Sequence, residues 1–157
     1  MKFIVREVEP AAVTARSKQA GKAQGRWDWV ERAVWTERML EALDKGVKGG
    51  VWFSLIDKVH RPKVLRAAWD IVKGKGRAVG SDHQSLEQFE EHLETNLAKL
   101  EEELRTGTYR PRPIRRTYID KPGSKDKRPL GIPAVRDKVV QTALKMVIEP
   151  IFEREFM

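Results

Sequence analysis

The sequence predicts an α+β fold that is mainly helical and carries one basic β-hairpin. Apolar residues recur at helical spacing over most of residues 27–157. A stretch with five prolines, residues 105–138, interrupts this spacing and has the pattern of two short strands joined by a turn. The chain has 157 residues, of which 40% are hydrophobic and 34% charged, as expected for one domain, or part of one, with a modest core.

The N-terminal part divides into an arm and helices. Residues 1–26 are rich in Ala, Gly, Gln, Lys and Arg without periodicity, which predicts a flexible basic arm. Helical spacing predicts a helix over 27–43. The tryptophans are expected to pack rather than to stack bases, and Trp27 and Trp29, which precede the strong apolar pattern, are candidates to dock on a further domain.

Three further helices are expected before the basic stretch. Residues 51–59 form a short apolar segment that Pro62 should interrupt, and a stronger pattern predicts a helix over 63–73. After a glycine-rich loop, Ser85 and Gln88 have the spacing of a capping box. They open the most regular helix, over 86–104, where leucines and Phe89 form the apolar face opposite an acidic one.

The basic stretch holds the net charge of the chain. Residues 105–138 contain seven Arg and four Lys against three Asp, a balance of +8 that equals the charge of the whole sequence. Strands are predicted over Ile114–Asp120 and Lys127–Ile132, with a turn between them. A final helix is expected from Val135 and should end before Pro150.

Composition narrows the function classes. A net charge of +8 and a pI near 9.8 favour an acidic partner, most often nucleic acid. We find no long apolar run or basic amphipathic helix that would favour a membrane, and we expect a cytoplasmic protein. The absence of cysteine excludes disulfides and thiolate sites, and the three histidines lack the spacing of a metal site.

Lys121 and Arg128 flank the predicted turn. If the strands pair, an ammonium and a guanidinium can converge on one anion, and a guanidinium offers bidentate contacts to phosphate. Gly131 permits a close backbone approach, and Pro129 and Pro133 stiffen the segment. The alternative is a solvated basic hairpin without a ligand.

Several segments, in order, resemble the group II intron reverse transcriptase/maturase family. The run 128–144, with Ile148–Phe152, is similar to its first two conserved blocks, and 107–116 resembles the approach to them. Residues 80–85 resemble the N-terminal block that separates this family from retroviral enzymes. Segments within 35–59 resemble the N-terminal extension of a bacterial subgroup, so that the likeness covers residues 27–157.

The resemblance implies the fingers of a right-hand polymerase preceded by extension helices. Its domains would be the arm (1–26), the N-terminal extension (27–80) and partial fingers (81–157). It implies that Lys121 and Arg128 contact the triphosphate of the incoming nucleotide. Template or other nucleic-acid contacts are implied for Arg110, Arg112, Arg115, Arg116, Pro129, Leu130, Gly131, Ile132 and Pro133, and a lid loop over the template for Gly76, Arg77, Gly80 and Asp82.

The implied activity is RNA-directed DNA polymerisation together with intron splicing and retrohoming. Its partners would be intron RNA, an RNA template, a DNA primer, dNTPs and the remaining palm and thumb domains. The Mg²⁺-binding palm carboxylates are expected beyond Met157, because this sequence has no Asp-Asp pair, so no catalytic residue is expected within it. The alternatives are a stand-alone RNA-binding remnant without polymerase activity and a basic interaction protein without nucleic-acid specificity.

Two positions depart from the family pattern. Asp120 stands where a proline is usual, next to Lys121, and Ser81 stands where an aliphatic residue is usual. An acid beside Lys121 is expected to weaken its hold on phosphate, and Ser81 raises a question about how the lid loop packs. Asp82, Asp120, Asp126 and Asp137 are expected to act as caps, turn residues or local ion-pair partners.

Overall fold

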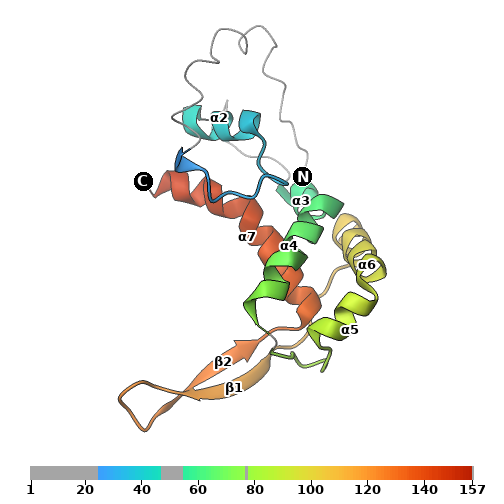
Figure 1. Ribbon diagram of the computed structural model, residues 1–157, viewed down its shortest axis with the longest axis vertical. Coiled ribbons are helices and arrows are strands. Elements are labelled where there is room, and N and C mark those ends of the chain that lie inside the picture. The colour runs from blue at the N-terminus through green and yellow to red at the C-terminus, as the bar shows by residue number, and fades with distance from the viewer. Residues whose placement is uncertain (1–24, 47–54, 77, 157) are drawn as a thin grey trace, which may run out of the picture.

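A computed structural model describes residues 25–46, 55–76 and 78–156. Figure 1 shows a mainly helical body from which a two-stranded antiparallel hairpin projects, which confirms the predicted α+β class. The described elements are α2 (Glu37–Lys45), α3 (Leu55–Val59), α4 (Pro62–Lys75), α5 (Leu86–Glu91), α6 (Leu93–Thr106), β1 (Arg115–Asp120), β2 (Lys127–Ile132) and α7 (Val135–Glu155).

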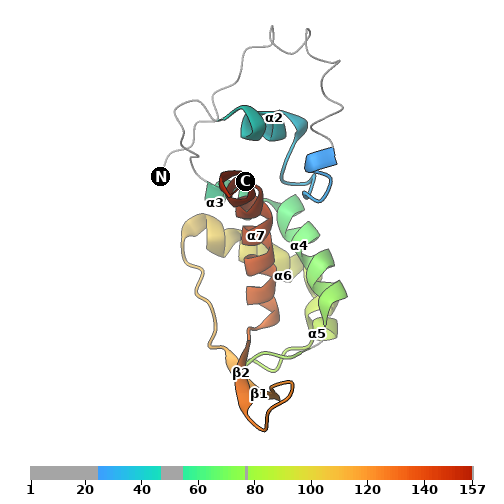
Figure 2. The ribbon, with the colours of Figure 1, turned by 90° about the vertical axis from the view of Figure 1, so that its left-hand side faces the viewer.

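Helix α7 lies at the centre of the helical body, and most of the other described helices pack around it. It packs along α4 and contacts α2, α3 and α6 (Figures 1 and 2). One hydrophobic cluster joins residues on both sides of residue 80, so the predicted extension and fingers segments share a core. Its fully buried large side chains include Trp27, Trp35, Leu43, Leu65, Trp69, Phe89, Leu100, Val135 and Val139.

The first predicted helix is wrong in its N-terminal half. Residues 27–36 form turns, and α2 begins only after Thr36. Trp27 is 0% exposed and its Nε1 donates to Asp44 Oδ1 at 2.9 Å, so it belongs to this core rather than to a docking surface. Trp29, by contrast, is 49% exposed.

The prediction for the leucine-rich helix was right at its start and wrong in its middle. Ser85 Oγ accepts from Gln88 N at 3.1 Å and Gln88 Oε1 accepts from Ser85 N at 2.9 Å, which confirms the capping box. The helix then breaks at His92 into α5 and α6. At the break, Asn96 Nδ2 donates to the carbonyl of Phe89 at 2.9 Å, so a side chain takes up a backbone acceptor there.

Of the two expectations about proline, the one at Pro62 is confirmed and the one at Pro150 was wrong. Helix α3 ends at Val59, and Pro62 opens α4, because the first helical position needs no intrahelical N–H. Pro150 lies inside α7, which continues to Glu155. Pro150 cannot donate to the carbonyl four residues earlier, that of Met146, and this carbonyl instead accepts the buried Trp35 Nε1 at 2.9 Å. The replacement donor allows the helix to continue.

The hairpin confirms both predicted strands to within one residue. Arg115 pairs with Ile132 and Asp120 with Lys127, so side chains alternate between two faces. The Arg128 face carries Arg115, Thr117, Ile119, Arg128, Leu130 and Ile132. The Tyr118 face carries Arg116, Tyr118, Asp120, Lys127, Pro129 and Gly131.

Candidate nucleic-acid interface

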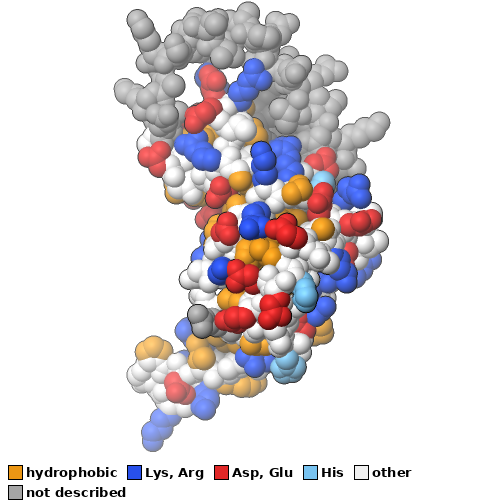
Figure 3. Space-filling view, turned by 45° about the vertical axis from the view of Figure 1, so that its right-hand side comes forward, with side chains coloured by type: hydrophobic (Ala, Val, Ile, Leu, Met, Phe, Trp, Pro, Cys, Tyr) orange, Lys and Arg blue, Asp and Glu red, His pale blue; other side chains and the backbone are white. Residues whose placement is uncertain are grey.

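The hairpin extends away from the helical body, beyond one end of α7 (Figures 1 and 2). Residues 120–131 are all exposed, and burial resumes only at Ile132, where β2 meets the body. Figure 3 shows Lys and Arg side chains near the hairpin tip, hydrophobic side chains along it and acidic side chains on the visible face of the body. The projecting element therefore combines positive charge with accessible apolar surface.

Lys121 and Arg128 lie on a common side of the hairpin. Arg128 is opposite Ile119, and the backbone N of Lys121 donates to the carbonyl of Asp126 at 3.0 Å, which continues the register by one step. Lys121 follows Ile119 by two residues, so strand alternation puts it on the Arg128 face. Within the described residues neither side chain has a hydrogen-bonding or ion-pair partner, and both are exposed.

Asp120 does not share this face. It is the partner of Lys127 in the strand register, on the Tyr118 face. The acid that replaces the usual proline therefore points away from the side occupied by Lys121 and Arg128. Because Asp120 and Lys121 lie on opposite faces, we expect Asp120 to interfere less with a phosphate at Lys121 than the sequence alone suggests.

The arginines of the approach to the hairpin divide into two kinds. Arg115 and Arg116 are exposed and have no ion-pair partner in the described part of the chain. Arg112 Nη1 donates to Asp82 Oδ2 at 2.7 Å, and Arg110 Nη1 donates to the carbonyl of Tyr109 at 2.9 Å. Arg115 and Arg116 are thus available to an outside anion, whereas Arg112 would have to leave Asp82.

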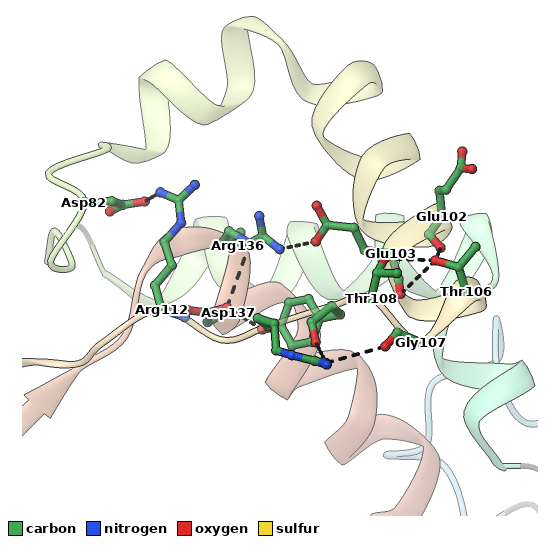
Figure 4. Close-up of polar contacts among 11 residues, drawn as sticks. Asp82, Glu102, Glu103, Thr106, Gly107, Thr108, Arg112, Arg136 and Asp137 are labelled. Carbon is green, nitrogen blue, oxygen red and sulfur yellow. Dashed lines mark hydrogen bonds and ion pairs between the residues drawn. The ribbon is translucent and has the colours of Figure 1, made fainter.

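A buried polar network anchors the start of the hairpin, where Figure 4 shows Arg112, Arg136, Glu103 and Asp137 converging. Asp137 is 2% exposed and accepts from the Tyr109 hydroxyl and, at 2.9 Å, from the backbone N of Arg112. Arg136 pairs with Glu103, and its guanidinium carbon lies 5.3 Å from the centre of the Tyr109 ring. Both Asp137 oxygens therefore bind the irregular segment that leads into β1.

Sequence reasoning missed most of this network. It expected Asp137 to act as a cap, turn residue or local ion-pair partner and did not single out Tyr109, Arg136 or Glu103. Burial, followed by the hydrogen bond to Asp137, raises the pKa of Tyr109. No spacing signal links Tyr109 to Asp137, since the two side chains meet across 28 residues of chain.

Two of the predicted lid residues, Gly80 and Asp82, lie against the base of the hairpin. Gly80 is buried, and a Cβ placed there would lie 2.5 Å from Ala134 Cα and 2.8 Å from the carbonyl oxygen of Pro133. Ser81 Oγ donates to the carbonyl of Pro113 at 2.5 Å, which gives this departure from the family pattern a polar contact. Of the other lid positions, Gly76 follows α4 directly and Arg77 lies outside the described residues.

Lys138 holds the same segment from the other side. Its Nζ donates to the carbonyl of Ala78, between the predicted lid positions. Burial and the nearby Arg115 guanidinium lower the pKa of Lys138, and Asp82 opposes them. The loop and the hairpin base are therefore tied together by both backbone and charged contacts.

A cavity of about 240 Å³ opens beside this junction. It is lined by Asp82, Gln84, Phe89, Asn96, Lys99, Leu100, Arg112 and Arg136. Three of these side chains are cationic and one is acidic, so the cavity continues the positive character of the hairpin base into the body.

The described residues offer no metal site, because no group of three or more His, Cys, Asp or Glu side chains is placed to hold an ion. These residues do not fit a Mg²⁺ centre. Among the same residues no helix has the length and apolar character needed to span a membrane.

Comparison with known proteins places relatives over parts of the chain. It is 46% identical over 104 residues to protein YkfC of Escherichia coli, covering 65% of this chain and 27% of that protein. It is 46% identical over 63 residues to the group II intron-encoded protein LtrA of Lactococcus lactis, covering 40% of this chain and 10% of LtrA. A putative COX1/OXI3 intron 1 protein of Saccharomyces cerevisiae is 39% identical over 59 residues, 38% of this chain and 7% of that protein. No family model matches the chain.

Proposed function

We propose, from the premise that this chain is a relative of the group II intron-encoded proteins, that it is the nucleic-acid- and nucleotide-gripping portion of such a protein. In this proposal the chain contributes template and triphosphate contacts to an RNA-directed DNA polymerase that also assists intron splicing. The aligned stretches span 27% of YkfC and 10% of LtrA, so the activity of a whole protein of this kind is part of the proposal.

One observation carries the proposal: Lys121 and Arg128 share a face of an exposed hairpin, with no partner among the described residues. Two unpaired cations on one side of a strand pair form a site for a polyanion, and the guanidinium offers two parallel donors. A nucleoside triphosphate fits such a site better than an isolated phosphate does, because its charge is spread over several oxygens.

The template role is proposed for the neighbouring positions. Arg115 lies on the same face, and Leu130 follows Arg128 there two residues along β2, whereas Ile132 at the end of the strand is buried. Leu130 is 44% exposed, so this face offers apolar surface next to cationic groups. Along β2, the apolar surface can contact the bases of a strand, and the cationic groups can contact its phosphates.

The test of the triphosphate role is Arg128→Ala in the polymerase that carries this segment. Loss of a charge-assisted contact should raise the apparent KM for dNTPs about 10- to 100-fold, while template affinity changes little. Lys63→Ala is the matched control, because it removes an exposed cation of α4 in the helical body and should leave that KM unchanged. An unaltered KM in Arg128→Ala would leave the hairpin as an RNA-binding element without a nucleotide role.

A further inference from the structure

The Tyr118 face has features that the triphosphate site does not use. Tyr118 is 58% exposed and Ile114, just before β1, is 59% exposed. An aromatic ring held on a strand has little freedom to lose on binding, and every nucleobase presents a flat face that can stack on it.

Gly131 keeps this face flat. A Cβ added to Gly131 would lie 2.8 Å from Ile114 Cγ2, so the side chain of Ile114 occupies the space above the glycine. Pro129, opposite Tyr118 in the register, also presents a compact apolar ring. This face therefore presents a low apolar platform along the hairpin, formed by Ile114, Gly131, Pro129 and Tyr118.

Cations border the platform on both strands. Arg116 is opposite Gly131, and Lys127 lies near the tip, opposite Asp120. Residues 115–132 contain six Lys and Arg against two Asp, a balance of +4. This charge favours a polyanionic strand over a protein as the occupant of an apolar platform.

We propose that the Tyr118 face is a second contact for single-stranded nucleic acid, in which a base stacks on Tyr118 and adjacent phosphates meet Arg116 and Lys127. The inference rests on the proposed function, because it assumes that the hairpin works on nucleic acid. It adds a binding surface on the side opposite Lys121 and Arg128. The hairpin then holds nucleotide and template on the Arg128 face and a further unpaired stretch of strand on the Tyr118 face.

The test is the affinity of the full chain for a labelled 12-nucleotide single strand, measured by fluorescence anisotropy with RNA and with DNA of the same sequence. Tyr118→Ala should weaken binding about 5- to 100-fold, the range expected for one lost stacking contact. Tyr118→Phe keeps the ring and should bind within about twofold of the unmodified chain. If the pattern appears with RNA, the bound strand is RNA, and if it appears with DNA, the bound strand is DNA. Either result supports the proposal.

Two additional measurements locate the contact. Phe152→Ala removes an exposed aromatic ring from α7 of the helical body and should leave affinity unchanged. An oligonucleotide containing 5-iodouridine should form a photo-crosslink to Tyr118, located by mass spectrometry. Equal losses in Tyr118→Ala and Tyr118→Phe, or no loss in either, would overturn this inference and leave the proposed function standing. Failure of the unmodified chain to bind any strand would refute both.

Discussion

Trp35 and Pro150 form a pair whose energies the structure predicts to be coupled. Trp35 is 0% exposed, and its indole N–H is 2.9 Å from the Met146 carbonyl that Pro150 cannot serve. Trp35→Phe would strand this carbonyl without a donor, at a cost of about 1–3 kcal/mol. The space left by the smaller ring adds about 1 kcal/mol. The free energy of unfolding should fall by roughly 2–4 kcal/mol in total.

The Pro150→Ala background isolates the hydrogen-bond part of that loss. Alanine restores an N–H four residues after Met146, so the carbonyl keeps a partner when Trp35 is replaced. Trp35→Phe should therefore cost about 1–2 kcal/mol less in this background, while the cavity part remains. Urea unfolding followed by circular dichroism of the four proteins gives the coupling energy. An identical cost of Trp35→Phe in both backgrounds would refute this account of how α7 passes Pro150.

Two further predictions concern the junction of loop and hairpin. Gly80→Ala should destabilise the chain by about 1–3 kcal/mol, because its Cβ meets the fixed backbone at Ala134, whereas Gly74→Ala in α4, with nothing within 4 Å, should be neutral or stabilising. Equal unfolding midpoints for the two variants would contradict the packing of Gly80. Burial and Asp137 raise the pKa of Tyr109, so the unfolded chain releases this proton first and stability should fall as pH rises above about 10. Tyr109→Phe should flatten that fall in urea titrations, and an unchanged slope would contradict the raised pKa.

Local patterns predicted the fold where neighbouring residues decide it. The capping box at Ser85 and the strands flanking the turn depend on residues a few positions apart, and the structure confirms both. The prediction at Pro150 was wrong because the hydrogen-bond donor that replaces its missing N–H comes from Trp35, 111 residues away from Met146. Trp27 was misjudged because its burial depends on helices that follow it.

The candidate site was predictable to the same extent. The placement of Lys121 and Arg128 on one face follows from strand alternation and the length of the turn. The ion pair between Arg112 and Asp82 could not be predicted from the spacing of residues in the sequence, since it depends on how the loop packs on the hairpin base. Sequence patterns identify which cations are present, while the fold decides which of them remain available.

We propose that the hairpin, and not the basic composition as a whole, provides nucleic-acid binding. The direct test is the Kd of the chain for structured RNA between 50 and 200 mM salt, with Arg115 and Arg116 both changed to Gln. The matched control changes Lys63 and Lys145, exposed cations of the helical body. We predict that only the hairpin variant binds more weakly. Its slope of log K against log salt concentration should also be smaller in magnitude by about 1–2. Equal weakening by both variants would show that binding follows overall charge and would contradict this proposal.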